Sequence, residues 1–159
     1  MPHLFCVALC RTVKTSLSSI GDAALTIPKM TPARVDANTL QDERWEDQAR
    51  GTVRFRTLIS APDTQTDSLV CGVALMAKGE TFALHSHAHA EVYFGLEGEG
   101  AVVIDGEQHR LAPGVALFIP AGAMHGIPLA TGPLKWFYTF AADRFSDIHY
   151  RFAHDDTAE

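Results

Sequence analysis

The sequence predicts an all-β protein built as a single barrel or sandwich, and three observations lead to this prediction. Short segments rich in β-branched, aromatic or alternating apolar residues follow one another from Thr52 to Phe152. Turn-forming residues, mainly Gly, Pro, Asp and Ser, separate these segments. The 159 residues suffice for one domain with a hydrophobic core but not for two. About ten short strands at this spacing are typical of a β-sandwich or a β-barrel.

The first fifty residues carry little strand-like sequence. Residues 1–29 contain the apolar run LFCVALC, which is short and lacks the preceding basic segment of a secretory signal. Patterned sequence begins after Met30, so we expect residues 1–29 to be a disordered upstream extension and Met30 to be the natural start. Residues 30–51 are predicted to form an N-terminal arm with one short helix around Leu40 to Gln48, where acidic and helix-forming residues gather.

The barrel itself is predicted to span residues 52–152. Its expected strands are 52–60, 68–77, 82–87, 91–98, 101–105, 108–112, 115–121, 125–130, 135–141 and 148–152. The pair Asp105-Gly106 is a strong signal for a two-residue β-hairpin. A turn is expected at residues 141–147, and residues 153–159 are predicted to be a flexible tail.

Charge and composition exclude several classes of partner. The formal net charge of −6 and the isoelectric point near 5.7 leave no basic surface for nucleic acid or an anionic membrane. No apolar run approaches the ~20 residues that span a bilayer. The three cysteines, Cys6, Cys10 and Cys71, are an odd number without metal-like pairing, which favours a reducing, cytoplasmic compartment over a disulfide framework. Cys71 lies in an apolar run and is expected in the core.

The stretch LHSHAHAEVYFGLEGEG, residues 84–100, concentrates polar side chains within an otherwise apolar strand pattern. Because side chains alternate across a strand, His85, His87, Glu91 and Tyr93 share one parity, and a single bend at residues 88–90 leaves all four facing the barrel interior. Four polar groups in an apolar cavity cost several kcal/mol if they have no partner. The pattern therefore predicts a bound group among them.

Imidazole nitrogens together with one carboxylate suit a borderline divalent metal. His125 follows a later strand and a Pro-Ala-Gly turn, and this position predicts that it supplies a further ligand. We therefore expect one divalent transition metal per chain at His85, His87, Glu91 and His125, with Fe(II) first and Ni(II), Mn(II) or Zn(II) as other possibilities. The alternative is a metal-free barrel in which these groups only hydrogen-bond one another.

Four other histidines are expected to play no part in the site. His89 falls at the bend and is interpreted as a residue of the barrel mouth or surface. His109 lies just after the predicted hairpin turn, and His149 and His154 lie near the end of the chain, so these three are expected to be solvated.

The same residues carry a family resemblance. Gly79-x5-His85-x-His87-x3-Glu91-x6-Gly98 matches the first motif of the cupin superfamily, and Gly114-x5-Pro120-x-Gly122-x2-His125 matches the core of the second. The Asn that often ends the second motif is absent, with Leu129 near its place, but that Asn is not a metal ligand. The resemblance covers about residues 50–152. It implies a cupin barrel, a double-stranded β-helix of jelly-roll type, and the homodimers that small cupins often form.

Within this superfamily, HSHAHAEVY, the closing segment LKWFYTFAADRFSDIHYRF and the small size resemble the cupin-type dimethylsulfoniopropionate lyases of marine bacteria. That resemblance implies that His85, His87, Glu91 and His125 hold the metal and that Tyr93 is the catalytic base. A tyrosine on a strand is more often a packing residue, but the shared parity with the ligands favours the catalytic interpretation.

The implied reaction is a β-elimination that yields dimethyl sulfide and acrylate from a small-molecule substrate. The metal binds the substrate carboxylate, Tyr93 removes the α-proton, and an aromatic wall such as Trp136 or Tyr138 stabilises the sulfonium by cation–π contact worth ~0.5–2 kcal/mol. Trp136, Tyr138 and Phe140 alternate with Phe137, and the sequence leaves open which set faces the cavity.

Two other functions use the same ligand set. A non-haem iron cupin dioxygenase would keep open metal positions for O₂ and a chelating substrate. A non-catalytic cupin that binds a sugar or a small acid would keep the pocket and tolerate the loss of Tyr93.

Overall fold

The computed structural model describes residues 30–155 and contains eleven β-strands and three short 3-10 helices. The strands are β1 (Glu43–Arg44), β2 (Arg54–Ile59), β3 (Val70–Met76), β4 (Phe82–Ser86), β5 (Glu91–Gly98), β6 (Gly100–Ile104), β7 (Glu107–Leu111), β8 (Ala116–Ile119), β9 (His125–Ile127), β10 (Leu134–Phe140) and β11 (Arg151–Phe152). The 3-10 helices are η1 (Ala37–Thr39), η2 (Gln48–Arg50) and η3 (Phe145–Asp147).

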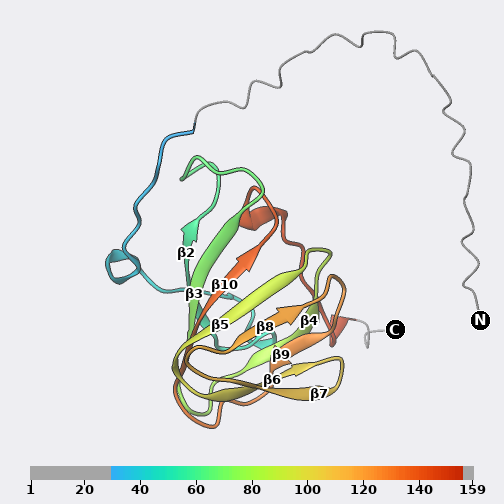
Figure 1. The fold of residues 1–159 in the computed structure, drawn as a ribbon. Helices are drawn as coiled ribbons and strands as arrows, with labels where there is room; N and C mark the ends of the chain where they lie inside the picture. Colours follow the sequence, from blue (N-terminus) through green and yellow to red (C-terminus); the bar gives the residue numbers. More distant parts are fainter. Residues whose placement is uncertain (1–29, 156–159) are drawn as a thin grey trace, which may run out of the picture.

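These strands form two antiparallel sheets that face each other (Figure 1). One sheet has the order β1-β2-β3-β10-β5-β8 and the other the order β11-β4-β9-β6-β7. Because β10 lies between β3 and β5, the chain crosses repeatedly from one sheet to the other, as expected for a jelly roll. The prediction of an all-β fold of this type is confirmed.

The barrel interior is filled by the inward-facing residues of the central strands. On β10, Trp136, Tyr138 and Phe140 are all buried, whereas Phe137 and Thr139 between them are partly exposed. Burying a side chain such as Phe140 stabilises the fold by about 1.5–3 kcal/mol. This alternation settles which aromatic residues of β10 face inward. Gly72 of β3 makes room for one of them, because a Cβ atom there would lie 2.3 Å from the hydroxyl oxygen of Tyr138.

The predicted hairpin at Asp105-Gly106 joins β6 to β7, with Ile104 opposite Glu107. Both turn residues have positive φ, 47° and 86°, as a type I′ turn requires. The hairpin also contacts the loop before β9. The backbone N–H of Asp105 donates to the Met124 carbonyl, and the Met124 N–H donates to the Asp105 carboxylate, both at 2.8 Å.

The N-terminal arm (residues 30–51) does not contain the predicted helix. The expected helical region around Leu40 to Gln48 holds the short strand β1 and the start of η2 instead. Two aspartates explain the difference, because Asp36 and Asp47 each accept a hydrogen bond from a backbone N–H two residues later, which favours single 3-10 turns. A continuous helix would also lose the pairing of β1 with β2.

Four further predictions concern the ends of the chain and Cys71. The expectations for residues 1–29, including Cys6 and Cys10, lie outside the described residues, as does most of the predicted tail. The last predicted strand is shorter than expected, since β11 covers only Arg151 and Phe152. Cys71 is a buried free cysteine, as predicted. Within residues 30–155, no helix is long and apolar enough to span a membrane.

Candidate metal centre and active-site cavity

Three separate segments bring the predicted ligands together. His85 lies on β4, and the chain then bends at residues 87–90, so His87 stands just past the end of that strand. Glu91 opens β5, and His125 opens β9, where it lies directly opposite His85 in the β4–β9 pair. All four residues are buried, each with 3% or less of its surface exposed. The bend expected at residues 88–90 is thus present, and the four side chains face one interior space.

The three histidine rings are oriented in the same way. In each ring Nδ1 contacts a backbone carbonyl two residues away: His85 to Ala83 at 2.8 Å, His87 to His89 at 2.8 Å, and His125 to Ala123 at 2.9 Å. A carbonyl only accepts, so each Nδ1 carries a proton and each ring directs its Nε2 atom away from that carbonyl. This arrangement is typical of metal-binding histidines, whose second nitrogen is held by a backbone or carboxylate partner.

Ring nitrogens of the three histidines lie close to one another and to a carboxylate. Ligand atoms of the three histidines lie within 4.8 Å of one another. The Oε2 atom of Glu91 lies 3.2 Å from Nε2 of His125 and 3.4 Å from Nε2 of His87. Nε2 of His85 is buried and has no hydrogen-bond partner among residues 30–155. Three nitrogen lone pairs and one carboxylate oxygen form a donor set that fits a borderline divalent cation.

The pKa of His85 is consistent with a metal-binding role. Burial lowers the pKa of His85 well below its usual value, and the neighbouring His125 and His87 rings lower it further. The Ala83 carbonyl opposes this shift without overcoming it. His85 is therefore neutral at physiological pH, which is the form that binds a metal.

A small, mostly apolar cavity borders Glu91, the one predicted ligand among its lining residues. Its volume is about 20 Å³, enough for one water molecule. The lining residues are Trp45, Val53, Phe55, Ala74, Phe82, Glu91, Tyr93, Trp136, Tyr138, Phe145 and Tyr150. Tyr93, Trp136 and Tyr138, which the sequence singled out, all border this space. The indole N–H of Trp136 and the hydroxyl of Tyr138 are buried without a hydrogen-bond partner among the described residues.

Two of the lining tyrosines lie beside the Glu91 carboxylate. Burial raises the pKa of Tyr93 well above its usual value, and the negative charge of Glu91 raises it further. The same two causes, in the same order, raise the pKa of Tyr150. The pKa of Tyr138 is also raised, chiefly by burial. Without a nearby cation, all three phenols therefore stay protonated at neutral pH.

Sequence reasoning missed Tyr150 and Trp45. The ring of Tyr150 lies 5.0 Å from that of His85 and 5.4 Å from that of His87, closer than the 6.2 Å between Tyr93 and His125. Tyr150 was expected in a strand but lies in the segment between η3 and β11. Trp45 was expected in a helix of the N-terminal arm. The only sequence signal for either residue was an aromatic side chain within a predicted element.

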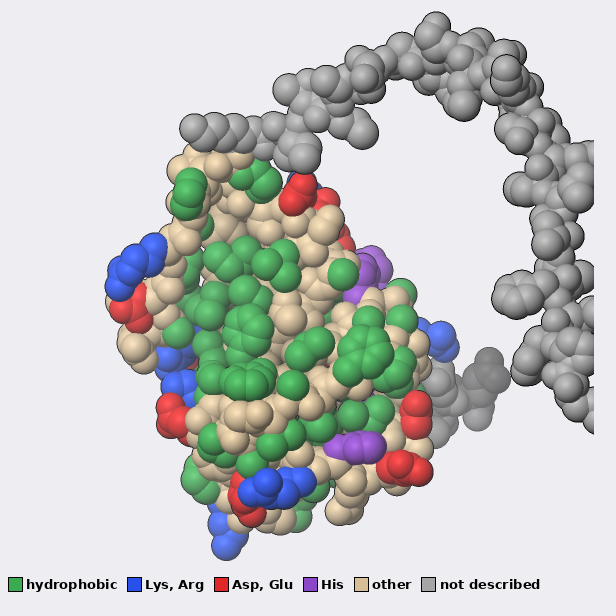
Figure 2. All heavy atoms as spheres, in the orientation of Figure 1, with side chains coloured by type: hydrophobic (Ala, Val, Ile, Leu, Met, Phe, Trp, Pro, Cys, Tyr) green, Lys and Arg blue, Asp and Glu red, His purple; other side chains and the backbone are tan. Residues whose placement is uncertain are grey.

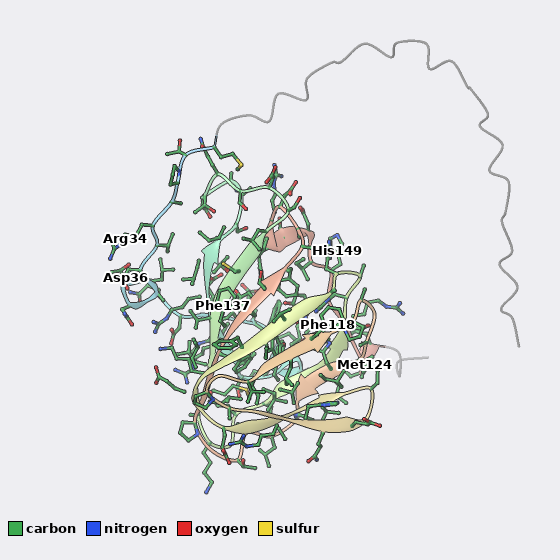
Figure 3. The ribbon with its side chains drawn as sticks, viewed as in Figure 1. Arg34, Asp36, Phe118, Met124, Phe137 and His149 are labelled. Atoms are coloured by element: carbon green, nitrogen blue, oxygen red, sulfur yellow. The ribbon has the colours of Figure 1, made fainter. Side chains whose placement is uncertain are left out.

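Among residues 30–155, the other histidines do not add their rings to the cluster. His149 and His154 are exposed and His109 is partly exposed, as expected. Figure 3 labels His149 on the rim of the molecule. His89 is partly buried, and its backbone carbonyl, rather than its ring, contacts the site through His87.

Comparisons with known proteins identify relatives of this chain in sequence and in fold. A model of the cupin domain matches residues 72–140. Dimethylsulfoniopropionate lyase DddW of Ruegeria pomeroyi is 39% identical over 141 residues, which cover 89% of this chain and 90% of the lyase.

Two solved structures share the fold at lower identity. The polyketide cyclase RemF of Streptomyces resistomycificus has a TM-score of 0.66 and 22% identity, covering 77% of this chain and 86% of the cyclase. A predicted oxalate decarboxylase of Thermotoga maritima has a TM-score of 0.60 and 21% identity, covering 69% of this chain and 99% of that protein. Their different activities illustrate that this fold does not by itself determine a reaction.

Proposed function

Because this chain belongs to the cupin family and, within it, to the dimethylsulfoniopropionate lyases, we propose that it cleaves dimethylsulfoniopropionate to dimethyl sulfide and acrylate. The observation that carries the proposal is the cluster of three histidine rings beside the Glu91 carboxylate, which itself borders a cavity lined by three tyrosines. Such a site offers a metal-binding face, a candidate base and an aromatic wall for a sulfonium. These are the three parts that this elimination needs.

The metal ligands are His85, His87, Glu91 and His125 in this proposal, with Fe(II) as the first candidate ion and Ni(II), Mn(II) or Zn(II) as the others. When bound, a divalent metal supplies positive charge that polarises the substrate carboxylate, acidifies the adjacent C–H and favours the phenolate form of a nearby tyrosine. The carbonyl contacts at all three Nδ1 atoms support this ligand set, because they hold each ring with Nε2 toward the centre.

Tyr93 is the proposed base. It is on the same face of β5 as Glu91, two residues further along, and its ring lies 6.2 Å from that of His125. As phenolate it takes the proton from the carbon next to the substrate carboxylate. The electron pair of that C–H bond forms the carbon–carbon double bond, and the bond from the β-carbon to sulfur breaks. Dimethyl sulfide leaves as a neutral molecule, acrylate keeps the carboxylate, and Tyr93 then loses its proton to solvent.

The aromatic wall is the proposed site of the sulfonium group. Trp136 and Tyr138 face the cavity from β10, and both are almost completely buried. A cation against the face of such a ring gains about 0.5–2 kcal/mol.

Detection of dimethyl sulfide in the headspace above metal-loaded protein and dimethylsulfoniopropionate tests this function. Production of dimethyl sulfide with equal acrylate and no oxygen uptake is the expected result. Consumption of oxygen instead would indicate the dioxygenase alternative, and substrate binding without products would indicate the binding alternative. Addition of a chelator should stop product formation, and restoring the metal should restart it.

We further propose that the protein forms a homodimer in the cytoplasm. On the outer face of the larger sheet, the apolar side chains of Phe94, Phe118 and Phe137 come from adjacent strands β5, β8 and β10. Figure 2 shows apolar side chains gathered over the middle of this face, and Figure 3 labels Phe118 and Phe137 on it. A second copy presents the same uncharged surface, which supports self-association. The cysteine usage supports the cytoplasmic location.

A further inference from the structure

The cavity is too small for the substrate proposed above. Its volume of about 20 Å³ holds one water molecule, whereas dimethylsulfoniopropionate is several times larger. If this substrate reaches the histidines, one wall of the cavity must move. Given the proposed function, the way each part of the wall is held indicates which part moves.

Most of the wall is fixed by the sheets and the core. Tyr93, Trp136 and Tyr138 lie on β5 and β10, strands that are hydrogen-bonded on both sides within the larger sheet. The C-terminal part of the wall, which carries Tyr150, is anchored by two buried neighbours. Ile148 is 5% exposed, and Phe152 is fully buried on β11, which pairs with β4. Opening either part would break strand pairing or expose core side chains.

The N-terminal arm (residues 30–51) supplies the remaining wall through Trp45. From Met30 to Arg50, no residue of the arm is buried. Trp45 is the apolar arm residue that packs against the hydrophobic core, and Arg50 lies over the rings of Trp45 and Phe152. Its ring lies 5.0 Å from that of Tyr150, which in turn contacts His85. A segment with few buried apolar contacts has a low free energy of local opening.

The two-residue edge strand β1 and a set of charged contacts hold the arm against β2. One Asp42 carboxylate oxygen lies 2.7 Å from Nε of Arg56, and the other lies 3.4 Å from a guanidinium nitrogen of Arg54. Arg56 also donates to the Ala37 carbonyl at 2.8 Å. We call Asp42, Arg54 and Arg56 the arginine clasp. Its nearest member to the indole in the sequence is Asp42, three residues before Trp45. Figure 1 shows the arm, blue to cyan, running along the outside of β2.

We propose that Trp45 is the movable wall of the substrate cavity and that the arginine clasp sets how often it opens. When the arm lifts, the indole leaves the rings of Tyr150 and Phe55, and the cavity opens toward solvent. When it closes over bound substrate, the indole completes the aromatic enclosure opposite Trp136. Trp45 then limits the size of the substrate that fits, and the clasp governs how readily substrate leaves.

Tryptophan fluorescence tests the arm without any turnover. The chain has two tryptophans, and Trp136 is fully buried, so quenching by acrylamide reports on Trp45. Trp45→Phe gives the Trp136 baseline. Arg56→Gln should raise the quenching constant about two- to fivefold, the range expected for loss of a half-buried ion pair. Added NaCl should act in the same direction. Arg110→Gln, which removes the exposed Arg110–Glu99 pair on the β6–β7 hairpin, is the matched control and should change nothing.

A reversible disulfide between the arm and β2 tests whether movement of the arm is needed for turnover. Arg44 and Arg54 are directly opposite on antiparallel β1 and β2, and such pairs have Cα atoms about 4.5–5.5 Å apart, within reach of a disulfide. Arg44→Cys with Arg54→Cys, in a Cys6→Ser and Cys10→Ser background, should lose at least tenfold in kcat/KM when oxidised. Reduction should restore it. The background protein, treated with the same oxidant, is the control.

The outcomes separate the two proposals. An oxidised form that turns over as fast as the reduced form, or an Arg56→Gln protein with unchanged Trp45 quenching, overturns the movable wall. A protein that releases no dimethyl sulfide even when reduced overturns the proposed function instead, while the quenching result still stands. In active protein, Arg56→Gln should raise KM several-fold with a smaller change in kcat, because the closed complex releases substrate more readily.

Discussion

Oε2 of Glu91 lies 3.2 Å from Nε2 of His125, although the two residues belong to strands of opposite sheets. Glu91 opens β5 of the larger sheet, and His125 opens β9 of the smaller one. The site is therefore formed by the closure of the barrel and not by either sheet alone. A metal held at this point links the two sheets, so metal content and stability should change together.

His87→Ala and His125→Ala should each lower metal content. Removing one ring leaves an incomplete coordination sphere, and we expect a loss of metal affinity of about 100-fold or more, above the ~10–100-fold seen when only an outer partner is removed. Metal analysis of dialysed protein measures this, with His109→Ala as control. Full occupancy in both variants would mean that the ligands are assigned wrongly.

Tyr93→Phe should keep the metal and the fold but lose turnover. The change removes one oxygen while the ring still packs against Trp136, 5.4 Å away between centroids. A positioned general base contributes ~10²–10⁴-fold, so kcat should fall by that factor with little change in KM. Wild-type turnover in this variant would transfer the role to Tyr150, whose ring lies nearer to His85 and His87.

The raised pKa values of the tyrosines predict that the folding stability of the metal-free protein decreases at alkaline pH. The chain has three, Tyr93, Tyr138 and Tyr150, and all have raised pKa values in the folded state. An unfolded tyrosine loses its proton near pH 10, whereas these stay protonated. Folding stability is therefore full below pH 10 and decreases as pH rises above it. Absorbance at about 295 nm should show no tyrosinate at pH 10 until the metal-free protein unfolds.

Adding metal should change that titration in one respect. If Tyr93 is the base, a single tyrosine should ionise at lower pH in the loaded protein, because nearby positive charge favours phenolate. The signal should be absent in Tyr93→Phe and present in Tyr138→Phe. Three tyrosines that titrate alike with and without metal would count against a phenolate base.

Phe118→Asp should convert a dimer to a monomer. Phe118, on the edge strand β8, is 67% exposed on the apolar face of the larger sheet. A buried aspartate without a partner is strongly unfavourable at an interface. Sedimentation or light scattering measures the change. Leu129→Asp alters a similarly exposed apolar residue outside the strands and should leave the mass unchanged. A wild-type protein that is already monomeric would contradict the homodimer proposal.

The sequence was sufficient for those features that depend on local alternation and fixed spacing. The parity of His85, Glu91 and Tyr93 predicted a shared interior face, and the short turn at Asp105-Gly106 predicted its hairpin. Both depend on residues within a few positions of one another. His125, which is distant in the sequence, was predicted from its position after a later strand and a Pro-Ala-Gly turn, and the second family motif includes the same residue.

Trp45 and Tyr150 could not be placed in the same way. They contact each other across more than 100 residues, and neither lies in a regular element with an alternating pattern. The arm was predicted as a helix because its composition favours one, but the tertiary contacts of Asp42 and Glu43 with β2 outweigh that weak preference. Which face of β10 is inward was likewise decided by packing against Gly72 and not by its aromatic content.

The hairpin at Asp105-Gly106 restricts where this protein can be modified. A two-residue surface turn is ordinarily a good place to graft a peptide tag or a fluorescent domain. Here both hydrogen bonds between Asp105 and Met124 would be lost, and Met124 directly precedes His125. A graft at this turn would therefore shift the backbone that positions His125 and weaken metal binding there, even though no atom of the insert came near the cavity. Fusions belong at the C-terminal end of the described chain, beyond the strand that carries Phe152.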